Sequence, residues 1–434
     1  MSGMTHFRQP EQLTMLRYGA KWVPLSAAVA LLAGSASALF LLALDWATQT
    51  REAHRWLLWL LPVAGCLVGW LYLKIGQSVE AGNNLLIDEI HDPKQVIPLR
   101  MAPLILLSTV ISHLFGAAVG REGTAVQMGG ALADQLTGVF RLRQEDRRIL
   151  LMAGISAGFA SVFGTPLAGA IFGLEVLALG RLRYDALLPC VVAAILADQV
   201  CMLWGVHHTH YAAGVIPAVS AWGLGATALA GILFGVVGMA FARSTQGLSA
   251  WMKERVSYAP LRPLFGGIAL ALAVWSLDGW RYVGLGLPVI SESFQHPVAP
   301  WDFLAKAAFT VLSLGTGFKG GEVTPLFYIG ATLGNAVAPL LQQPFALFAA
   351  LGFVAVFAGA ANTPLACTLM AIELFGHAIA PYAIVACVVS YLFSGHAGIY
   401  KSQRIGHPKH RHMPEGIQLS EVAEVKRRRK LDQL

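Results

Sequence analysis

Charge is scarce in this chain. Only 13% of its 434 residues are Asp, Glu, Lys or Arg, whereas 56% are hydrophobic and the mean hydropathy is +0.60. A water-soluble globule of ordinary composition cannot hide this much apolar surface. The composition therefore predicts an all-α integral membrane protein surrounded by the lipid bilayer, and no nucleic-acid partner is expected.

Residue patterns typical of several metal and catalytic sites are also missing. The five cysteines are scattered through apolar runs without paired spacing, which argues against a disulfide framework or a zinc site. The cluster HHTH at 207–210 has no Cys or carboxylate near it in the sequence, so no metal or cofactor is expected. No paired aspartates, His-Glu-x-x-His or Gly-x-Ser-x-Gly occur. An intramembrane enzyme using Glu122 or Glu322 with His113 is therefore disfavoured.

Apolar runs, by contrast, are abundant between residues 22 and 394. They supply ten or more candidate helices, at roughly 20 residues for each full crossing. Several runs are too short to span, and the 45 Gly and 21 Pro predict broken or half-length helices, which need to be buried in protein or to line a cavity. The runs do not alternate, which argues against a membrane β-barrel. The long first run lacks a cleavage signal and is interpreted as a retained helix.

Three landmarks recur in the same order along the chain. GTPLAGAIFGLEV at 164–176 returns as NTPLACTLMAIEL at 362–374, GREGTAVQMGGAL at 120–132 as GGEVTPLFYIGATL at 320–333, and AGNNLLIDEI at 81–90 as VGLGLPVISE at 283–292. The offsets agree, at 198 from Pro166 to Pro364 and 200 from Glu122 to Glu322. The sequence therefore predicts two repeated halves.

Basic residues give the halves opposite orientations. Lys and Arg precede the first helix but are absent from 206–223, and the bias reverses one hairpin later, in the 243–262 loop. By the positive-inside rule the repeat is inverted, which predicts a binding site near the midplane. The expected organisation is a cytoplasmic segment 1–21, a first repeat 22–205, an extracytoplasmic loop 206–220, a second repeat 221–405 and a basic cytoplasmic tail 406–434.

Two further segments of the sequence, 141–148 and the C-terminal tail, are rich in basic residues. The cluster RLRQEDRR at 141–148 is not placed by the charge argument. The tail is expected to be a solvated extension, and its segment HPKHRH at 407–412 is expected to meet anionic lipid headgroups.

The stretch GREGT at 120–124 puts a charge pair inside an apolar region. Glycines around a helix start let a ligand approach the backbone, and free N–H groups with the helix dipole make that end an anion site. The Glu122 carboxylate can act there as a tethered anion that leaves when it takes up a proton. Exchange of an anion for a proton follows from that competition. The alternative is an ion pair that stabilises a helix end.

These residues resemble the CLC superfamily of anion channels and anion/proton antiporters. GREGT matches its Gly-Arg/Lys-Glu-Gly signature, GGEVTP falls at its second-half Gly-Gly-x-x-x-Pro motif, and TPLAG, TPLAC and the terminal AGIYKSQ also fit. The resemblance covers nearly all of 22–405. It implies the CLC fold, an inverted repeat with many tilted, broken and half-length helices. It also implies a homodimer with one pore per subunit in the bacterial inner membrane, with both termini cytoplasmic.

Departures from the chloride-type pattern indicate the branch. Asn83 in GNNLL takes the position of the anion-coordinating Ser, and Thr124 stands where the signature usually ends in Pro. Val176 occupies the place of the usual second glutamate, while Glu322 appears in GGEVTP. Together these features look like the fluoride/proton antiporter branch. A chloride channel or chloride/proton antiporter is the alternative.

The resemblance also implies roles for individual residues. Glu122 would be the gate and proton acceptor, and Glu322 a second coupling carboxylate. An amide offers more N–H donors to a small, hard fluoride than a hydroxyl offers O–H donors, so Asn83 is a candidate ligand. Its alternative role is to start or cap a helix.

Other predicted fluoride contacts come from the two helix starts and the far end of the chain. Backbone N–H groups of Glu122, Gly123, Val323 and Thr324 would complete the cradle. The Tyr400 hydroxyl would face the anion, although an interfacial tyrosine is the alternative. Glu175 and Glu373 occupy equivalent repeat positions, which favours a structural role at helix ends.

Overall fold

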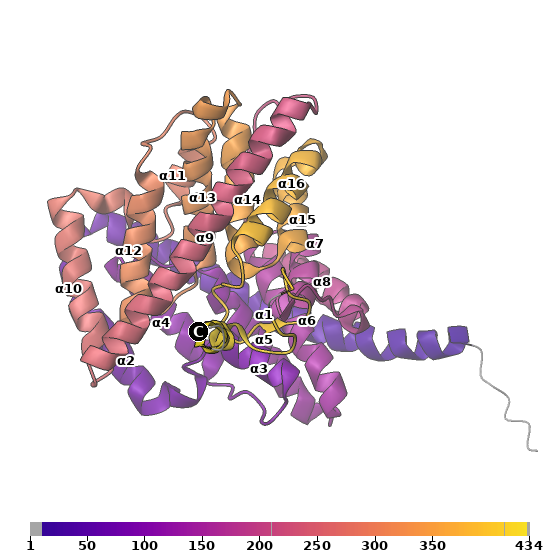
Figure 1. Ribbon diagram of the computed structural model, residues 1–434. Coiled ribbons are helices and arrows are strands. Elements are labelled where there is room, and N and C mark those ends of the chain that lie inside the picture. The colour runs from indigo at the N-terminus through magenta and orange to yellow at the C-terminus, as the bar shows by residue number, and fades with distance from the viewer. Residues whose placement is uncertain (1–10, 210, 412, 432–434) are drawn as a thin grey trace, which may run out of the picture.

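Two successive sets of eight α-helices make up most of the described part of the chain (Figure 1). The computed structural model describes residues 11–209, 211–411 and 413–431. The first set contains α1 (Glu11–Ala53), α2 (Leu61–Leu71), α3 (Asn83–His91), α4 (Met101–Phe115), α5 (Glu122–Val139), α6 (Gln144–Phe163), α7 (Pro166–Glu175) and α8 (Leu187–Leu203). The second contains α9 (Ala221–Arg255), α10 (Leu261–Ser276), α11 (Leu287–Glu292), α12 (Asp302–Thr316), α13 (Val323–Val337), α14 (Phe345–Ala361), α15 (Pro364–Phe375) and α16 (Ala380–Phe393).

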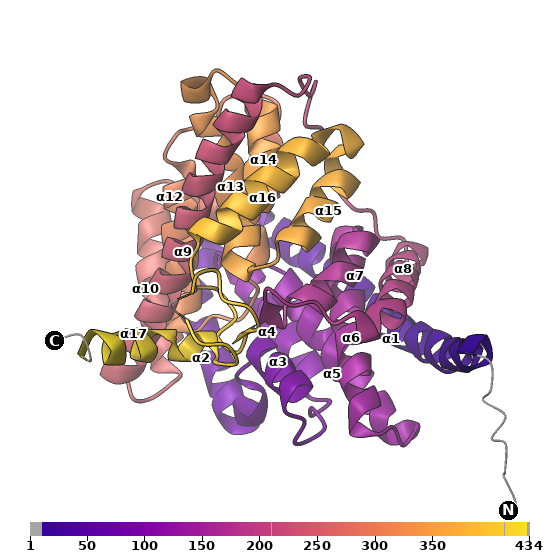
Figure 2. The same ribbon diagram turned by 45° about the vertical axis from the view of Figure 1, so that its right-hand side comes forward.

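The two sets correspond helix by helix. Each set begins with a long helix, α1 or α9. Each also contains a short helix, α7 or α15, that begins at the proline of a Thr-Pro pair. The packing corresponds as well, because α5 packs on α6 as α13 packs on α14, and α1 packs on α8 as α9 packs on α16. Figures 1 and 2 show the first set, indigo to magenta, beside the second, pink to yellow. The predicted all-α membrane fold with two repeated halves is confirmed.

Long apolar runs are divided into shorter helices at equivalent points. The run 149–180 breaks at Gly164 (φ 70°) and the run 344–375 at Asn362 (φ 58°), both of which adopt the left-handed conformation that ends a helix. Pro166 and Pro364 then stand at the first helical position, where a missing N–H is harmless. Within the described residues, four helices are long and apolar enough to cross a membrane and seven apolar ones are shorter.

Glycine allows the central helices to touch backbone to backbone. A Cβ atom on Gly330 of α13 would lie 2.0 Å from the Gly352 carbonyl oxygen of α14, and one on Gly129 of α5 would lie 2.3 Å from the Gly154 oxygen of α6. Small residues at such contacts are typical of helices packed inside a membrane. The same device in both halves holds α5 and α13, whose first residues form the central site.

The basic cluster at 141–148 contains a buried structural cation. Arg147, at the start of α6, lies within 2.7–2.9 Å of carboxylate oxygens of Asp134 on α5 and Glu89 on α3, and it also donates to the Gln95 carbonyl. Its side chain is 1% exposed. Arg147 therefore joins three helices of the first half. The distribution of charge along the sequence did not predict this role.

The tail differs from its predicted state. Residues 404–405 form strand β2 (Arg404–Ile405), which pairs in parallel with β1 (Ala178–Leu179) between α7 and α8. Farther on, α17 (Val422–Leu431) packs through Val422 into a small apolar cluster with Leu179, Ile405, Met413 and Leu419. The expectation of a solvated extension is wrong for these apolar residues, which pack against the loop after α7, while the other described residues of 406–428 whose burial is given are exposed or half-buried.

Lys409 turns inward instead of toward lipid headgroups. Its ammonium group donates to the Gly395 carbonyl and to Asn362 Oδ1, both at 2.6 Å, and lies 3.9 Å from the centre of the Tyr391 ring. Burial lowers its pKa to about 7. The predicted headgroup contact is therefore wrong for Lys409, which fastens the tail to the ends of α14 and α16.

Replacing Arg147 by Met should destabilise the protein strongly. The change leaves Glu89 and Asp134 buried without their cation, and breaking a buried ion pair in this way costs about 3–5 kcal/mol. The melting temperature of the purified protein in detergent measures the effect. Arg143→Gln removes an exposed charge from the same cluster and should leave the melting temperature near that of the wild type. Equal melting of the two variants would contradict the structural role of Arg147.

Candidate functional site

The loops that precede α5 and α13 are joined by their backbones. Gly120 and Gly321 exchange hydrogen bonds in an antiparallel bridge, with N···O distances of 2.6 and 2.8 Å. A Cβ atom on Gly120 would lie 2.8 Å from Pro325 Cδ, and one on Gly321 would lie 2.7 Å from the Gly123 nitrogen. Only glycine permits this approach. The bridge brings the positive N-terminal ends of two half-length helices together at one point.

The Glu122 carboxylate lies between the start of α13 and the start of its own helix, α5. Its side chain is fully buried, and Oε2 accepts from the Thr324 N–H at 3.0 Å while Oε1 accepts from the Thr324 hydroxyl. The Arg121 N–H also donates to Oε2, at 3.1 Å, and Arg121 Nε lies 3.5 Å from Oε1. Glu122 thus holds the position that a free anion would take at a helix N-terminus.

Glu322 faces a separate chamber. A cavity of about 220 Å³ is lined by Glu322 together with Asn83, Gln127, Lys319 and Tyr400. A methyl group placed on Gly123 would lie 3.0 Å from Asn83 Nδ2 and 3.8 Å from Glu322 Oε2. The Asn83 amide and the Glu322 carboxyl group therefore both lie near the N-terminal end of α5.

Asn83 and Tyr400 occupy positions that suit ligands. Asn83 is the first residue of α3, but Gly82 holds the N-cap position, and Asn83 Oδ1 is buried without a hydrogen-bond partner among the described residues. Tyr400 is 3% exposed and lies in the interior. The side chain of Asn83 does not cap its helix, and Tyr400 does not belong to an interfacial belt.

The predicted backbone donors also meet here. Gly123 and Val323 are buried in the first turns of α5 and α13, where N–H groups have no partner within the helix. Thr324 contributes its hydroxyl in addition to its N–H, which the sequence analysis did not foresee. Gln127 was missed as well, although its i+4 spacing from Gly123 on one helix face is a signal that could have found it.

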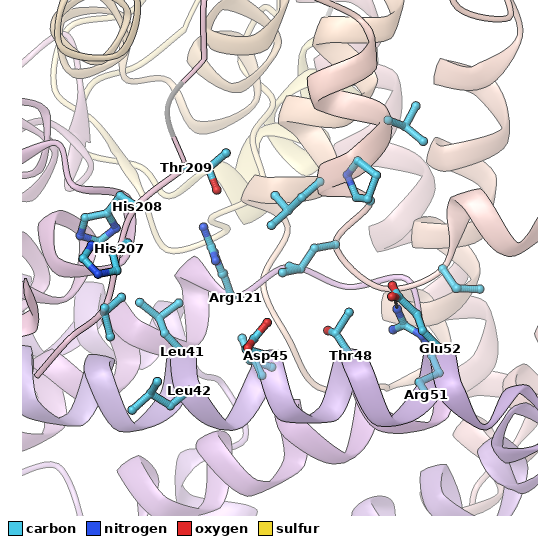
Figure 3. Close-up of a pocket in the computed structure, with 18 of the residues that line it drawn as sticks. Leu41, Leu42, Asp45, Thr48, Arg51, Glu52, Arg121, His207, His208 and Thr209 are labelled. Atoms are coloured by element: carbon cyan, nitrogen blue, oxygen red, sulfur yellow. Dashed lines mark ion pairs between the residues drawn. The ribbon is translucent and has the colours of Figure 1, made fainter.

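A larger vestibule opens on the other side of Glu122. It has a volume of about 680 Å³, and Figure 3 shows Arg121 and Thr209 projecting into it above Asp45, Thr48 and Arg51 of α1. A cavity of only about 20 Å³, lined by Arg121, Glu122 and Thr324 among others, adjoins the vestibule through Arg121, Thr209 and Leu287, which line both. That volume holds about one water-sized species. Glu122 therefore lies beside a small cavity next to the vestibule, while Glu322 lines the other chamber.

Glu175 and Glu373 have the structural role predicted from their symmetry. The Glu175 carboxylate, at the end of α7, accepts from the N–H groups of Leu365 and Ala366 at the start of α15 at 3.0 and 2.8 Å. Glu373, at the end of α15, accepts from Leu167 and Ala168 of α7 at 2.8 and 2.9 Å. Each carboxylate caps the helix of the other half.

The structure shows where two of the histidines considered above, His113 and His208, lie. His113 is fully buried in α4, and neither ring nitrogen has a hydrogen-bond partner within the described part of the chain, so it is not paired with Glu122 or Glu322. His208 lies 3.4 Å from Asp198, a carboxylate that sequence distance had concealed. Residue 210 lies outside the described residues, and those described contain no group of three potential metal ligands.

Comparison with known proteins identifies the family. The model of the voltage-gated chloride channel family matches residues 64–395. This chain belongs to the CLC family. Members of this family are channels and transporters rather than enzymes. A "Chloride/fluoride channel protein" of Pseudomonas syringae pv. tomato is 66% identical over 96% of this chain and 94% of its own length.

Solved structures support the same assignment. The crystal structure of a CLC-type fluoride/proton antiporter matches with a TM-score of 0.86 and 35% identity, covering 91% of this chain and 99% of the other. A slow cyanobacterial Cl⁻/H⁺ antiporter matches with a TM-score of 0.75 and 21% identity over 86% of this chain and 93% of its own, which shows the shared fold. The predicted resemblance to the fluoride/proton branch of the CLC family is confirmed.

Proposed function

We propose that this CLC protein is a secondary active transporter that exports fluoride in exchange for protons. The observation that carries the proposal is the Glu122 carboxylate, which takes both Thr324 donors at the start of α13. The fluoride/proton antiporter with 35% identity supports the choice of ion and coupling. Fluoride enters cells as the neutral acid and is trapped as the anion at higher internal pH, so a proton-driven exporter serves to remove a toxic ion.

Exchange follows from competition for one set of donors. While ionised, Glu122 is a tethered anion that closes the narrow passage and satisfies the Thr324 N–H and hydroxyl. A proton removes its charge, the carboxyl group leaves, and fluoride takes the same donors. Fluoride and the ionised carboxylate cannot hold the site together, because two like charges at close range in low dielectric repel strongly. Movement of the anion in one direction is thereby tied to movement of a proton in the other.

Glu322 is the second coupling group in this proposal. Two carboxyl groups near one buried point cannot both ionise without a large penalty, so one holds a proton. A protonated Glu322 donates a hydrogen bond to fluoride from the chamber that Asn83 and Tyr400 also line. A hard, compact anion gains more from such a donor than a large, weakly accepting one.

Chloride is the alternative substrate, since the name of the 66% identical relative includes both ions and the word channel. The donors near the two carboxyl groups favour fluoride. The Thr324 N–H and hydroxyl and the Asn83 amide can replace part of a tight water shell. Two buried carboxyl groups favour exchange over a channel, because a channel needs no proton acceptor.

We further propose the expected membrane arrangement. Both termini lie on the cytoplasmic side of a bacterial inner membrane, with repeats at 22–205 and 221–405, an extracytoplasmic loop at 206–220, and cytoplasmic segments at 1–21 and 406–434. The Lys and Arg bias of the loops supports this orientation. The family resemblance supports a homodimer with one pore per subunit, which the mass of the detergent-solubilised particle decides.

Efflux from proteoliposomes tests the function directly. Vesicles loaded with fluoride or chloride are diluted into buffer that contains neither ion, and the released anion and the internal pH are recorded together. The proposal requires fluoride efflux accompanied by internal acidification. Fluoride efflux without any pH change would indicate a channel, and faster chloride efflux would favour the alternative substrate.

Glu122→Gln should abolish coupled exchange and arrest transport. The neutral amide can neither accept a proton nor act as the tethered anion, while its size keeps the passage filled. The proteoliposome assay should show no fluoride-driven acidification. Substantial exchange by this variant would remove Glu122 from the proposed role.

Glu322→Gln should lower fluoride transport at least about tenfold, equivalent to about 1.4 kcal/mol in the barrier, while the protein still folds. The amide keeps the shape and a donor but cannot release a proton. Glu175→Gln is the matched control, because Glu175 caps α15 away from the chamber and its loss should leave coupling intact. Near-normal exchange by the Glu322 variant together with failure of the Glu175 variant would place the proton route near Glu175.

Asn83→Ser should reduce discrimination against chloride by about two- to tenfold. The change removes an N–H donor matched to a small ion, and one net hydrogen bond is worth about 0.5–1.5 kcal/mol. The ratio of fluoride to chloride efflux measures the effect. An unchanged ratio would show that Asn83 is not a selectivity ligand.

A further inference from the structure

A further cavity, which shares no lining residue with the chamber at Glu322, contains several charged side chains. It has a volume of about 480 Å³ and opens where the loop after α7 meets the tail strand β2. Arg181, Arg183, Arg404, His91 and Glu415 supply its charged or titratable side chains. A cavity with three arginines and one carboxylate suits an anionic ligand.

Two of the three arginines have no side-chain hydrogen bond or ion pair among the described residues. Arg183 is occupied, because it pairs with Asp185 at 2.6 Å. Glu415 is exposed and lies 3.2 Å from His407 Nδ1. The side chains of Arg181 and Arg404 form neither a hydrogen bond nor an ion pair with any residue that the structure describes. Their guanidinium groups are therefore available to a ligand.

The backbone fixes the separation of these two arginines. Arg404 pairs with Ala178 in the parallel β1–β2 ladder, and the N–H groups of Gly406 and His407 both donate to the Leu179 carbonyl at 3.0 Å. Gly406 also packs under Arg181, since a Cβ atom there would lie 2.8 Å from Arg181 Cβ. The loop and the tail thus hold one arginine each at a shared wall, so a ligand between them bridges two distant parts of the chain.

The neighbouring residues place the cavity at the edge of the bilayer. Tyr184 is 69% exposed at the start of the candidate span Tyr184–Leu203, and Leu187 and Leu188 are exposed in the next turn. An exposed tyrosine followed by exposed leucines is typical of the passage from headgroups to hydrocarbon. A ligand in the cavity therefore lies at headgroup level.

We propose that Arg181 and Arg404 bind the phosphate of an anionic phospholipid headgroup. Guanidinium groups match phosphate oxygens with paired, charge-assisted hydrogen bonds, and basic pockets between helices on the cytoplasmic side of membrane proteins bind such headgroups. The cavity has room for the phosphate together with its glycerol. A bound headgroup would tie the tail, which follows Tyr400 by only four residues at Arg404, to the loop after α7. This site is independent of which anion the central pathway carries.

Lipid binding to the full-length, delipidated protein tests the proposal. Phosphatidylglycerol, zwitterionic phosphatidylcholine and inorganic phosphate are titrated separately, with bound lipid counted by native mass spectrometry and stability followed by thermal melting. Phosphatidylglycerol should bind and raise the melting temperature, whereas phosphatidylcholine should not. Arg181→Gln/Arg404→Gln should weaken phosphatidylglycerol binding at least about tenfold, because two charge-assisted contacts are lost.

Two further variants make the outcome decisive. Lys426→Gln/Arg427→Gln removes the same charge from exposed positions of α17 and should bind phosphatidylglycerol as the wild type does. Arg181→Gln alone, at an exposed position, should weaken binding even if the double variant folds poorly. Competition by inorganic phosphate that depends on both arginines would support the phosphate site with a soluble source. Unchanged binding by the arginine variants, or an equal loss in the α17 control, would overturn the proposal.

Discussion

The backbone bridge between Gly120 and Gly321 is the constraint on which the rest of the structure depends. It forces the N-terminal ends of α5 and α13 to one point inside the protein. Their unpaired N–H groups and aligned dipoles need negative charge or strong acceptors, because water is excluded. The protein meets this need with its own Glu122 carboxylate. The site therefore favours an anion at all times, and the Glu122 side chain supplies one when no free anion is bound. A free anion can enter only if the Glu122 carboxylate gives up its place, which is the competition that exchange requires.

Holding two helix ends at one point requires a rigid frame, and the repeat supplies it twice. The reciprocal caps make each half the support of the other, since Glu175 stabilises the start of α15 and Glu373 the start of α7. Glycine contacts keep α5 and α13 close to their neighbours, and the buried Arg147 fastens α6 to α3 and α5. The helices that carry the central site are thereby fastened to their neighbours, and the exchange proposed above needs only the Glu122 side chain to move.

Local sequence reveals those parts of the molecule whose cause is local. Glycine, a charge and an apolar run suffice to find the start of α5, and the Thr-Pro steps mark α7 and α15. Features that depend on partners distant in sequence were hidden. Nothing near Arg147 shows that Glu89 lies beside it 58 residues away, and nothing near Lys409 points to Asn362. Charge alone therefore misjudged the tail, because a basic segment can fold when a few apolar residues find a shared cluster.

Selectivity for a small anion follows from how the donors are arranged, more than from the charge at the site. Any helix N-terminus attracts anions, so the dipoles alone cannot separate fluoride from chloride. Discrimination requires donors close enough together to replace a tight hydration shell. Thr324 donates its N–H and its hydroxyl to the two carboxylate oxygens of Glu122. Asn83 Nδ2 lies close to Gly123, next to Glu122 in the chain. A larger anion could approach these groups only one at a time, and would leave buried donors unpaired at a cost of about 1–3 kcal/mol each.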